Sequence, residues 1–188
     1  EADDKPGQVD VYHLLGMISQ YGGDLETAPT HYQQALSLAR ELDDDYRVML
    51  SSNNLGILST EIGDYDTARA YYEHTLATAK RIGARMGVAG SLLNIGVIER
   101  NQGKYDAAEA RFTESLAAFE NLQIPRGIIL ALAHLGNIAD YHKDYETGLA
   151  HYQRSIDISS TGQDHHTHAS TLNDMAFNRM LAGDLNAA

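Results

Sequence analysis

The chain has 188 residues, and its 26 Asp and Glu against 14 Lys and Arg give a formal net charge of −12 at pH 7. Because nucleic-acid binding needs clustered Lys and Arg to meet phosphates, this balance argues against a nucleic-acid partner. The sequence has no Cys, which excludes disulfides and thiol catalysis and is compatible with the reducing cytoplasm, where we expect the protein to reside. No apolar run approaches the roughly 18 residues of a membrane span, so no membrane partner is expected.

The spacing of apolar residues predicts a series of helix pairs along the chain. The helices of the first pair are expected at about residues 8–21 and 25–42. Pro29 would lie one turn inside the second of them, which predicts that this helix is kinked or starts late. Acidic residues 43–45 serve the start of the next pair, Gly83 closes that pair, and Pro125 takes the first position of the fourth pair. The pairs are expected over residues 8–44, 45–84, 85–124, 125–164 and, in part, 165–188.

One motif recurs every 40 residues, as from Leu15 to Leu55. In its clearest copy, Leu55-Gly56 in a first helix is followed by a Gly63-Asp64 turn, and then by a small residue and a ring in a second helix. The other copies of the Leu-Gly pair are Leu15-Gly16, Ile95-Gly96, Leu135-Gly136 and Met175-Ala176. Self-similarity at a fixed period of this length indicates a solenoid of stacked helix pairs.

Gly56 lies inside a predicted helix, where glycine costs about 1 kcal/mol relative to alanine. Glycine at four of the five equivalent places therefore predicts a packing reason. We expect the backbone of the paired helix to pass too close for a Cβ, with Ala68 facing the glycine and Tyr72 filling the space farther along. On this basis, Gly56→Leu is expected to unfold the protein through overpacking.

These residues resemble the tetratricopeptide repeat family, whose pattern combines a Leu-Gly pair, an acidic and aromatic turn, a small residue, a ring and a second small residue. The matching residues of the second copy are Leu55, Gly56, Asp64, Tyr65, Ala68, Tyr72 and Thr75. The family's usual period is about 34 residues, and it often carries a proline after the second helix. The 40-residue variety here lacks that proline and is similar to the repeats of kinesin light chains, cell-polarity adaptors and the helical arms of bacterial and archaeal ATP-dependent regulators.

The resemblance implies an all-α fold, with residues 1–188 forming one right-handed superhelix of antiparallel helix pairs, about 4.5 repeats long. It also implies that the first helices of the pairs line a concave face that binds extended or helical protein segments. The expected partner-binding residues are His13, Met17, Asn53, Asn54, Ile57, Leu93, Asn94, Val97, Arg100, Asn137, Asn173 and Phe177.

Asparagines set into an apolar stripe suit this function because an amide side chain both donates and accepts hydrogen bonds with a peptide backbone. The alternative is structural: the asparagines bond across adjacent first helices, and the apolar residues pack between repeats. Under the binding interpretation, Asn53→Ala leaves the melting temperature nearly unchanged. A clamp for a terminal carboxylate, which some family members use on chaperone tails, is not expected because Arg100 is the only cation predicted on this face.

Catalytic and metal motifs are weak in this sequence. Residues 164–168, Asp-His-His-Thr-His, resemble a metal site, but no fourth ligand follows at a defined spacing, so neither a metal nor another cofactor is predicted. There is no Gly-x-Ser-x-Gly elbow and no phosphate-cradling glycine loop. Recurring acids such as Asp64 and Asp66 are explained as helix caps and dipole partners. We therefore expect no enzymatic activity.

The sequence thus predicts a protein–protein interaction module. A second hypothesis is a sensory or oligomerisation arm of a larger ATP-dependent signalling or transcription regulator, with an effector or another domain on the concave face. A third is self-association through the C-terminal end, because the second helix of the fifth pair is cut off and Phe177 would be left uncovered. The chain begins at Glu1 rather than Met and stops inside a helix, which we interpret as a fragment of a longer protein.

Overall fold

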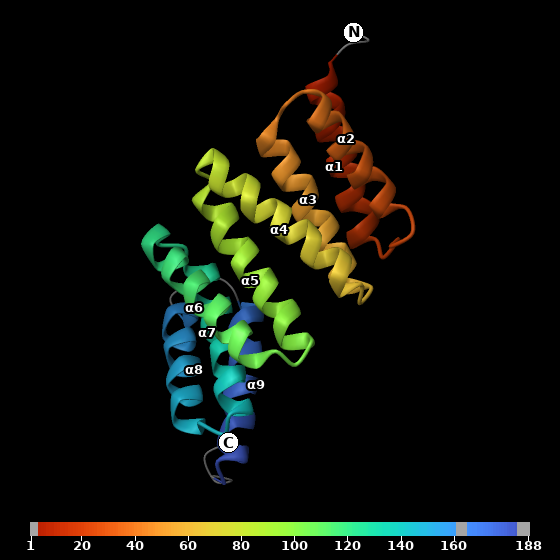
Figure 1. The fold of residues 1–188 in the computed structure, drawn as a ribbon. Coiled ribbons are helices and arrows are strands. Elements are labelled where there is room, and N and C mark those ends of the chain that lie inside the picture. The colour runs from red at the N-terminus through yellow and green to blue at the C-terminus, as the bar shows by residue number, and fades with distance from the viewer. Residues whose placement is uncertain (1–3, 161–164, 184–188) are drawn as a thin grey trace. The chain divides into compact units, whose positions relative to one another are not determined.

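The computed structural model describes residues 4–160 and 165–183, without the side chains of residues 165–168. The helices in this part of the chain are α1 (Lys5–Tyr21), α2 (Ala28–Glu41), α3 (Asp45–Glu61), α4 (Tyr65–Ile82), α5 (Arg85–Asn101), α6 (Tyr105–Leu122), α7 (Pro125–Tyr141), α8 (Tyr145–Ser160) and α9 (His165–Leu181) (Figure 1). None of the described residues forms a strand. The predicted all-α helical-repeat fold is therefore confirmed.

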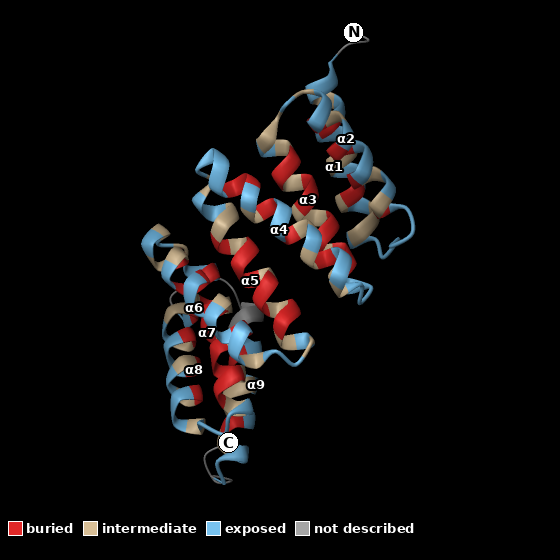
Figure 2. Cartoon of the chain, viewed as in Figure 1, coloured by how far each residue is buried: buried red, intermediate tan, exposed pale blue. Residues whose placement is uncertain are grey.

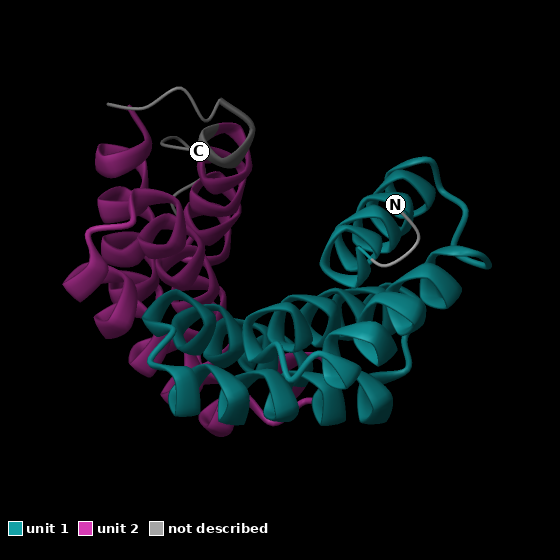
Figure 3. Cartoon of the chain, turned by 90° about the horizontal axis from the view of Figure 1, so that it is seen from above, with its two compact units in different colours: residues 1–98 teal, residues 99–188 magenta. Residues whose placement is uncertain are grey.

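The chain divides into two compact units, one ending at Ile98 and the other beginning at Glu99 (Figure 3). In the first unit α1 packs on α2 and α3 packs on α4, while α2 also covers α3. In the second unit α7 packs on α8, while α6 also covers α7 and α8 covers α9. The second helices α2 and α8 therefore each touch two first helices, the one before and the one after.

Most helix ends follow the sequence signals. Asp44 and Asp64 accept backbone hydrogen bonds at the starts of α3 and α4, and Gly83 ends α4 in the left-handed conformation. Pro125 is the first residue of α7, as predicted. The second helix of the first pair starts late, at Ala28 rather than near residue 25, because a proline at the second helical position is tolerated there whereas one deeper in the helix is not.

Each second helix from α2 to α8 carries a buried aromatic ring. Tyr32 and Tyr72 are almost fully buried in the first unit, as are Phe112 and Tyr152 in the second. Figure 2 marks the buried residues in red, and they recur along the helices of each unit. Burial raises the pKa of Tyr32 and of Tyr72 to about 12, so both hydroxyls stay protonated. The Tyr32 hydroxyl donates to Gln20 Oε1 at 2.9 Å, which satisfies the buried polar group.

The glycines of the first helices accommodate these rings. A Cβ added to Gly56 would lie 2.6 Å from the Tyr72 ring, and the same distance separates a Cβ on Gly16 from Tyr32. At Gly136 the corresponding distance to Tyr152 is 2.5 Å. The expectation that a backbone makes the close approach is therefore wrong. The aromatic ring of the second helix lies against the glycine itself, rather than farther along the helix.

This contact predicts opposite effects for two helical glycines. Gly56→Ala should lower the free energy of unfolding by about 1–3 kcal/mol, because its Cβ would force the Tyr72 ring to move. Gly90→Ala should raise it by roughly 0.5–1 kcal/mol, because a Cβ there meets no atom within 4 Å and alanine favours the helix. Urea unfolding followed by circular dichroism measures both changes. Equal destabilisation by the two variants would contradict the ring-on-glycine account.

Candidate partner-binding surface

Two clefts adjoin on the first helices of the first unit. The α1–α3 cleft has a volume of about 250 Å³ and is lined by Val9, Asp10, His13, Leu14, Met17, Arg47, Leu50 and Ser51. The α3–α5 cleft has a volume of about 330 Å³ and is lined by Tyr46, Met49, Leu50, Asn53, Thr75, Ala84, Met86, Gly87, Gly90 and Asn94. Leu50 lines both clefts, so together they form one surface across three successive first helices.

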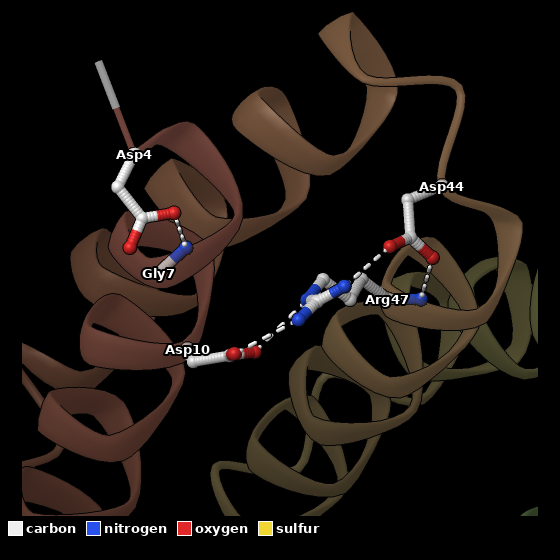
Figure 4. A network of polar contacts seen from close by, with 5 residues as sticks. All are labelled: Asp4, Gly7, Asp10, Asp44 and Arg47. Atoms are coloured by element: carbon white, nitrogen blue, oxygen red, sulfur yellow. Dashed lines mark hydrogen bonds and ion pairs between the residues drawn. The ribbon is translucent and has the colours of Figure 1, made fainter.

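A charged cluster lies at the mouth of the α1–α3 cleft. The guanidinium of Arg47 on α3 makes two hydrogen bonds to Asp10 on α1, at 2.9 and 2.8 Å (Figure 4). It also donates to Asp44 at 2.6 Å. These bonds hold the pKa of Arg47 above its ordinary value and the pKa of each carboxyl below it. The prediction that Arg100 is the only cation on this face is wrong, but Arg47 is already engaged by two carboxylates.

Polar side chains cross the floor of the clefts as a chain of hydrogen bonds. Asn94 on α5 donates to Asn53 on α3 at 3.4 Å, and Asn53 donates to Asn54 at 3.5 Å. Asn54 in turn lies 3.2 Å from Nε2 of His13 on α1. Because the Asn54 amide nitrogen can only donate, Nε2 must accept, and burial accordingly lowers the pKa of His13. The asparagines therefore do bond across neighbouring helices, through contacts near the upper limit of hydrogen-bond length.

The predicted binding residues fall in both compact units. The first unit contains His13, Met17, Asn53, Asn54, Ile57, Leu93, Asn94 and Val97, and the second contains Arg100, Asn137, Asn173 and Phe177. Four of them, His13, Met17, Asn53 and Asn94, line the two clefts. Leu93 is buried and Ile57 packs against the Tyr72 core, so these two have mainly structural roles. Asn173 and Phe177 are exposed on α9.

Within the second unit, the predicted residues contact neighbouring side chains of the same unit. Arg100 donates to Nδ1 of His134 at 3.1 Å, and the His134 ring stacks on Phe112 with centroids 4.7 Å apart. The Tyr152 hydroxyl lies 2.7 Å from Asn137 Oδ1 and 2.9 Å from an oxygen of Asp140. Asn137 therefore helps to satisfy a buried tyrosine of the second helix in its own pair, a structural role that differs from a bond between adjacent first helices.

Two cleft residues that the prediction missed, Arg47 and Met86, lie nearer the start of α3 and α5 than the predicted Asn53 and Asn94. Arg47 precedes Leu50 by three residues, and Met86 precedes Gly90 by four, so each pair shares a helix face. Extending the stripe toward the start of each first helix would have found both. No sequence signal shows that Arg47 pairs with Asp10, because that contact depends on how closely α1 and α3 approach.

A protein-family model described as a tetratricopeptide repeat matches residues 7–81 and again residues 87–161, which is more than half of the chain. The chain belongs to the tetratricopeptide repeat family. This confirms the resemblance on which the fold prediction rested. A search of curated proteins found no match to this tetratricopeptide repeat (TPR) chain.

Three solved structures with similar folds are TPR proteins or resemble them. A kinesin light chain-like protein from Podosopora anserina with nearly identical TPR-like repeats has 12% identity and a TM-score of 0.76, over 97% of this chain and 90% of the other. A Rap protein complexed with Competence and Sporulation Factor has 17% identity and a TM-score of 0.83, over 98% and 52%. A signal-transduction ATPase with a tetratricopeptide repeat sensor, from Pyrococcus horikoshii, has 14% identity and a TM-score of 0.82, over 96% and 28%.

These likenesses show the fold alone. The TPR chain spans about half of the Rap protein and less than a third of the ATPase, so the activities of those whole proteins do not transfer to it.

The described part of the TPR chain holds no group of three or more His, Cys, Asp or Glu placed to bind a metal ion. The side chains of the histidine cluster at residues 164–168 lie outside the described residues. Among the described helices, none has both the length and the apolar character needed to cross a membrane.

The environment of His134 predicts acid sensitivity of the TPR chain. Burial and, secondarily, Arg100 lower the pKa of His134 to about 4, whereas the pKa of a histidine in the unfolded chain is about 6.5. Between these pH values the unfolded state binds more protons, so stability rises with pH and is lost as pH falls through this window. When the pH falls from about 7.5 to about 5, the free energy of unfolding should decrease by roughly 1–2 kcal/mol less in His134→Asn than in the wild type. Urea unfolding of both proteins at the two pH values measures this difference. An identical loss in the variant and the wild type would contradict this environment.

Proposed function

We propose that this TPR chain is a protein-interaction module whose first unit binds a protein segment along the α1–α3 and α3–α5 clefts. The observation that carries the proposal is the adjacency of the two clefts, which share Leu50 and continue across three successive first helices. Membership of the family supports an interaction role, and the Rap protein of similar fold was solved in complex with Competence and Sporulation Factor.

The lining of the clefts favours apolar side chains of the partner. Met17 and Leu50 contribute flexible or branched apolar surface in one cleft, and Met49 and Met86 do so in the other. Methionine adapts its shape to different occupants. The long hydrogen bonds of Asn53 and Asn94 can be exchanged for bonds to the partner's backbone at little cost. A segment with two apolar anchors and an accessible backbone fits this arrangement.

Electrostatics favours a basic partner. The chain carries a net charge of −12, and the one arginine at the clefts is engaged by Asp10 and Asp44, which leaves that cluster net negative. An acidic surface attracts positively charged segments and speeds their association, an effect that weakens as salt screens it. The proposed ligand is therefore a segment with apolar anchors flanked by Lys or Arg.

A cleft-filling substitution tests this proposal. Gly90 lines the α3–α5 cleft, and a Cβ there meets no atom within 4 Å, so the side chain of Gly90→Leu should extend into the cleft without disturbing the fold. Peptides selected from a displayed random library on the wild type should be rich in apolar and basic residues. They should bind Gly90→Leu at least about tenfold more weakly in fluorescence anisotropy titrations.

Ala77→Leu is the matched control, because Ala77 is exposed on α4 and lines neither cleft. It should bind the selected peptides like the wild type, with the same helix content. The proposal would be contradicted if the selected peptides were acidic, or if they bound Gly90→Leu and Ala77→Leu with equal affinity.

A second candidate function is a sensory arm of a larger ATP-dependent signalling regulator. The archaeal ATPase with a tetratricopeptide repeat sensor favours it, as do cleft volumes close to those that hold small molecules. In that case a small-molecule library should contain compounds that raise the melting temperature of the wild type but not of Gly90→Leu, because binding only the folded state stabilises it. A shift shared by both variants would place the effector elsewhere.

Self-association through α9 is a further part of this proposal. Leu172, Phe177 and Met180 are exposed there, and Phe177 is 53% exposed. Exposed apolar clusters of this kind mark association sites. A concentration-dependent mass that Phe177→Asp abolishes in sedimentation would support it.

A further inference from the structure

Three tyrosines of this chain make the same two contacts with the preceding helix. The ring lies against a helical glycine, and the hydroxyl lies at 2.9, 3.3 and 2.9 Å from a side-chain oxygen four residues after that glycine. The three sets of glycine, tyrosine and polar residue are Gly16, Tyr32 and Gln20; Gly56, Tyr72 and Thr60; and Gly136, Tyr152 and Asp140. Because residues four apart share a helix face, one tyrosine side chain reaches both positions.

A phenylalanine that lies against a helical glycine lacks this polar partner. A Cβ added to Gly127 would meet the Phe119 ring, and the residue four positions after the glycine is the fully buried Ala131. Because phenylalanine has no hydroxyl, no polar group is needed there. In these four contacts, the residue four positions after the glycine therefore matches the kind of ring that covers the glycine.

Gly90 and Asn94 of α5 have the same spacing, but the described residues place no ring against this glycine. A Cβ added to Gly90 would meet no neighbouring atom within 4 Å, whereas Gly87, one turn earlier, is covered by Met49 and Ala79. Gly90 and Asn94 both line the α3–α5 cleft. Glycine inside a helix lowers stability relative to alanine, and it is favoured where a ligand approaches the backbone closely. The cleft therefore contains an uncovered glycine of the kind that the chain's own tyrosines cover elsewhere.

Asn94 is able to accept a hydrogen bond from a hydroxyl in this cleft. Its amide nitrogen donates to Asn53 at 3.4 Å, and this bond leaves the Asn94 Oδ1 atom able to accept. An amide oxygen already has this role elsewhere in the chain, because the Tyr32 hydroxyl donates to Gln20 Oε1 at 2.9 Å. The polar end of the uncovered site thus has the same chemistry as the site that Tyr32 occupies.

The remaining walls of the α3–α5 cleft suit a neutral aromatic group. Met49 and Met86 line the cleft, and Met86 is 49% exposed. Thioether sulfur packs favourably against aromatic rings. None of the described lining residues carries a charge, so a phenol can enter the cleft without burying an unpaired charge beside it.

We propose that the α3–α5 cleft binds a tyrosine side chain of the partner segment, with the ring against Gly90 and the hydroxyl donating to Asn94 Oδ1. This inference rests on the proposed function and specifies one of the two apolar anchors of the segment. Charge favours a tyrosine from another protein over one from a second copy of this chain. Two copies that each carry a net charge of −12 repel one another, whereas basic residues beside the partner's tyrosine complement that charge.

Peptides selected from the displayed random library on the wild type test this inference, because they should share a tyrosine at one fixed position. In the tightest-binding peptide, replacement of this tyrosine by leucine should weaken binding at least about tenfold, because the ring is lost. Replacement by phenylalanine should weaken binding about threefold to tenfold, because only the hydrogen bond is lost. Fluorescence anisotropy titrations with the three peptides measure both changes.

Two variants of the protein locate the tyrosine. Gly90→Ala should bind the tyrosine peptide at least about tenfold more weakly, although it should need more urea to unfold, because its methyl group stands where the ring would lie. A purely structural role of Gly90 would not separate binding from stability in this way. Asn94→Ala should bind the tyrosine and phenylalanine peptides equally, because the acceptor of the hydroxyl is gone.

Ala77→Leu is again the control, and it should keep the wild-type affinity and the preference for tyrosine. The tyrosine site is wrong, and the proposed function survives, if Gly90→Leu weakens binding of peptides that carry an aliphatic residue or phenylalanine at the fixed position. The tyrosine site is also wrong if Gly90→Ala binds as tightly as Ala77→Leu. If Gly90→Leu does not weaken binding of any selected peptide, the proposed function fails and this inference fails with it. A dimer in sedimentation that Gly90→Leu dissociates would assign the cleft to a second copy instead.

Discussion

Three of the described helix pairs depend on the contact between a glycine of the first helix and a tyrosine ring of the second. Tyr32, Tyr72 and Tyr152 each lie over a glycine of the preceding helix, closer than any Cβ would permit. The ring sets how near the two helices approach, and its hydroxyl reaches a polar group such as Gln20. The opposite side of the first helix is then free to form a surface. The α1–α3 and α3–α5 clefts are lined by residues of these first helices.

Periodicity in the sequence was enough to predict the helix pairs, their order and most of their caps, because these depend on local spacing and on residues such as Asp44 and Pro125. What it could not supply was the identity of the atoms across each interface. Gly56 was correctly assigned a packing role, but its neighbour was taken to be backbone rather than the Tyr72 ring. Arg47 was missed because its pairing with Asp10 joins residues 37 positions apart.

For the candidate site too, the pattern of residues along a helix face predicts some features of the surface and not others. The apolar and amide character of the surface follows from which residues share a helix face, and the predicted residues His13 and Asn53 line the clefts. Their hydrogen bonds to neighbouring helices depend on interhelical distances that no single stripe encodes. Leu93 is an example of the opposite outcome, because it lies on the expected helix face and yet is buried.

The junction between α8 and α9 differs in chemistry from the other junctions, and this difference bears on how similar repeats avoid mispairing during folding. Asn178 donates to Asp140 and to the Tyr145 carbonyl, and it has room to do so because Gly148 replaces the usual alanine. A helix such as α4, which carries Ala68 at that place, would crowd the amide if it docked on α9 by mistake. Helices of similar repeats can pair with the wrong neighbour while the chain folds. A polar junction that needs its own small residue raises the free energy of such mispaired arrangements.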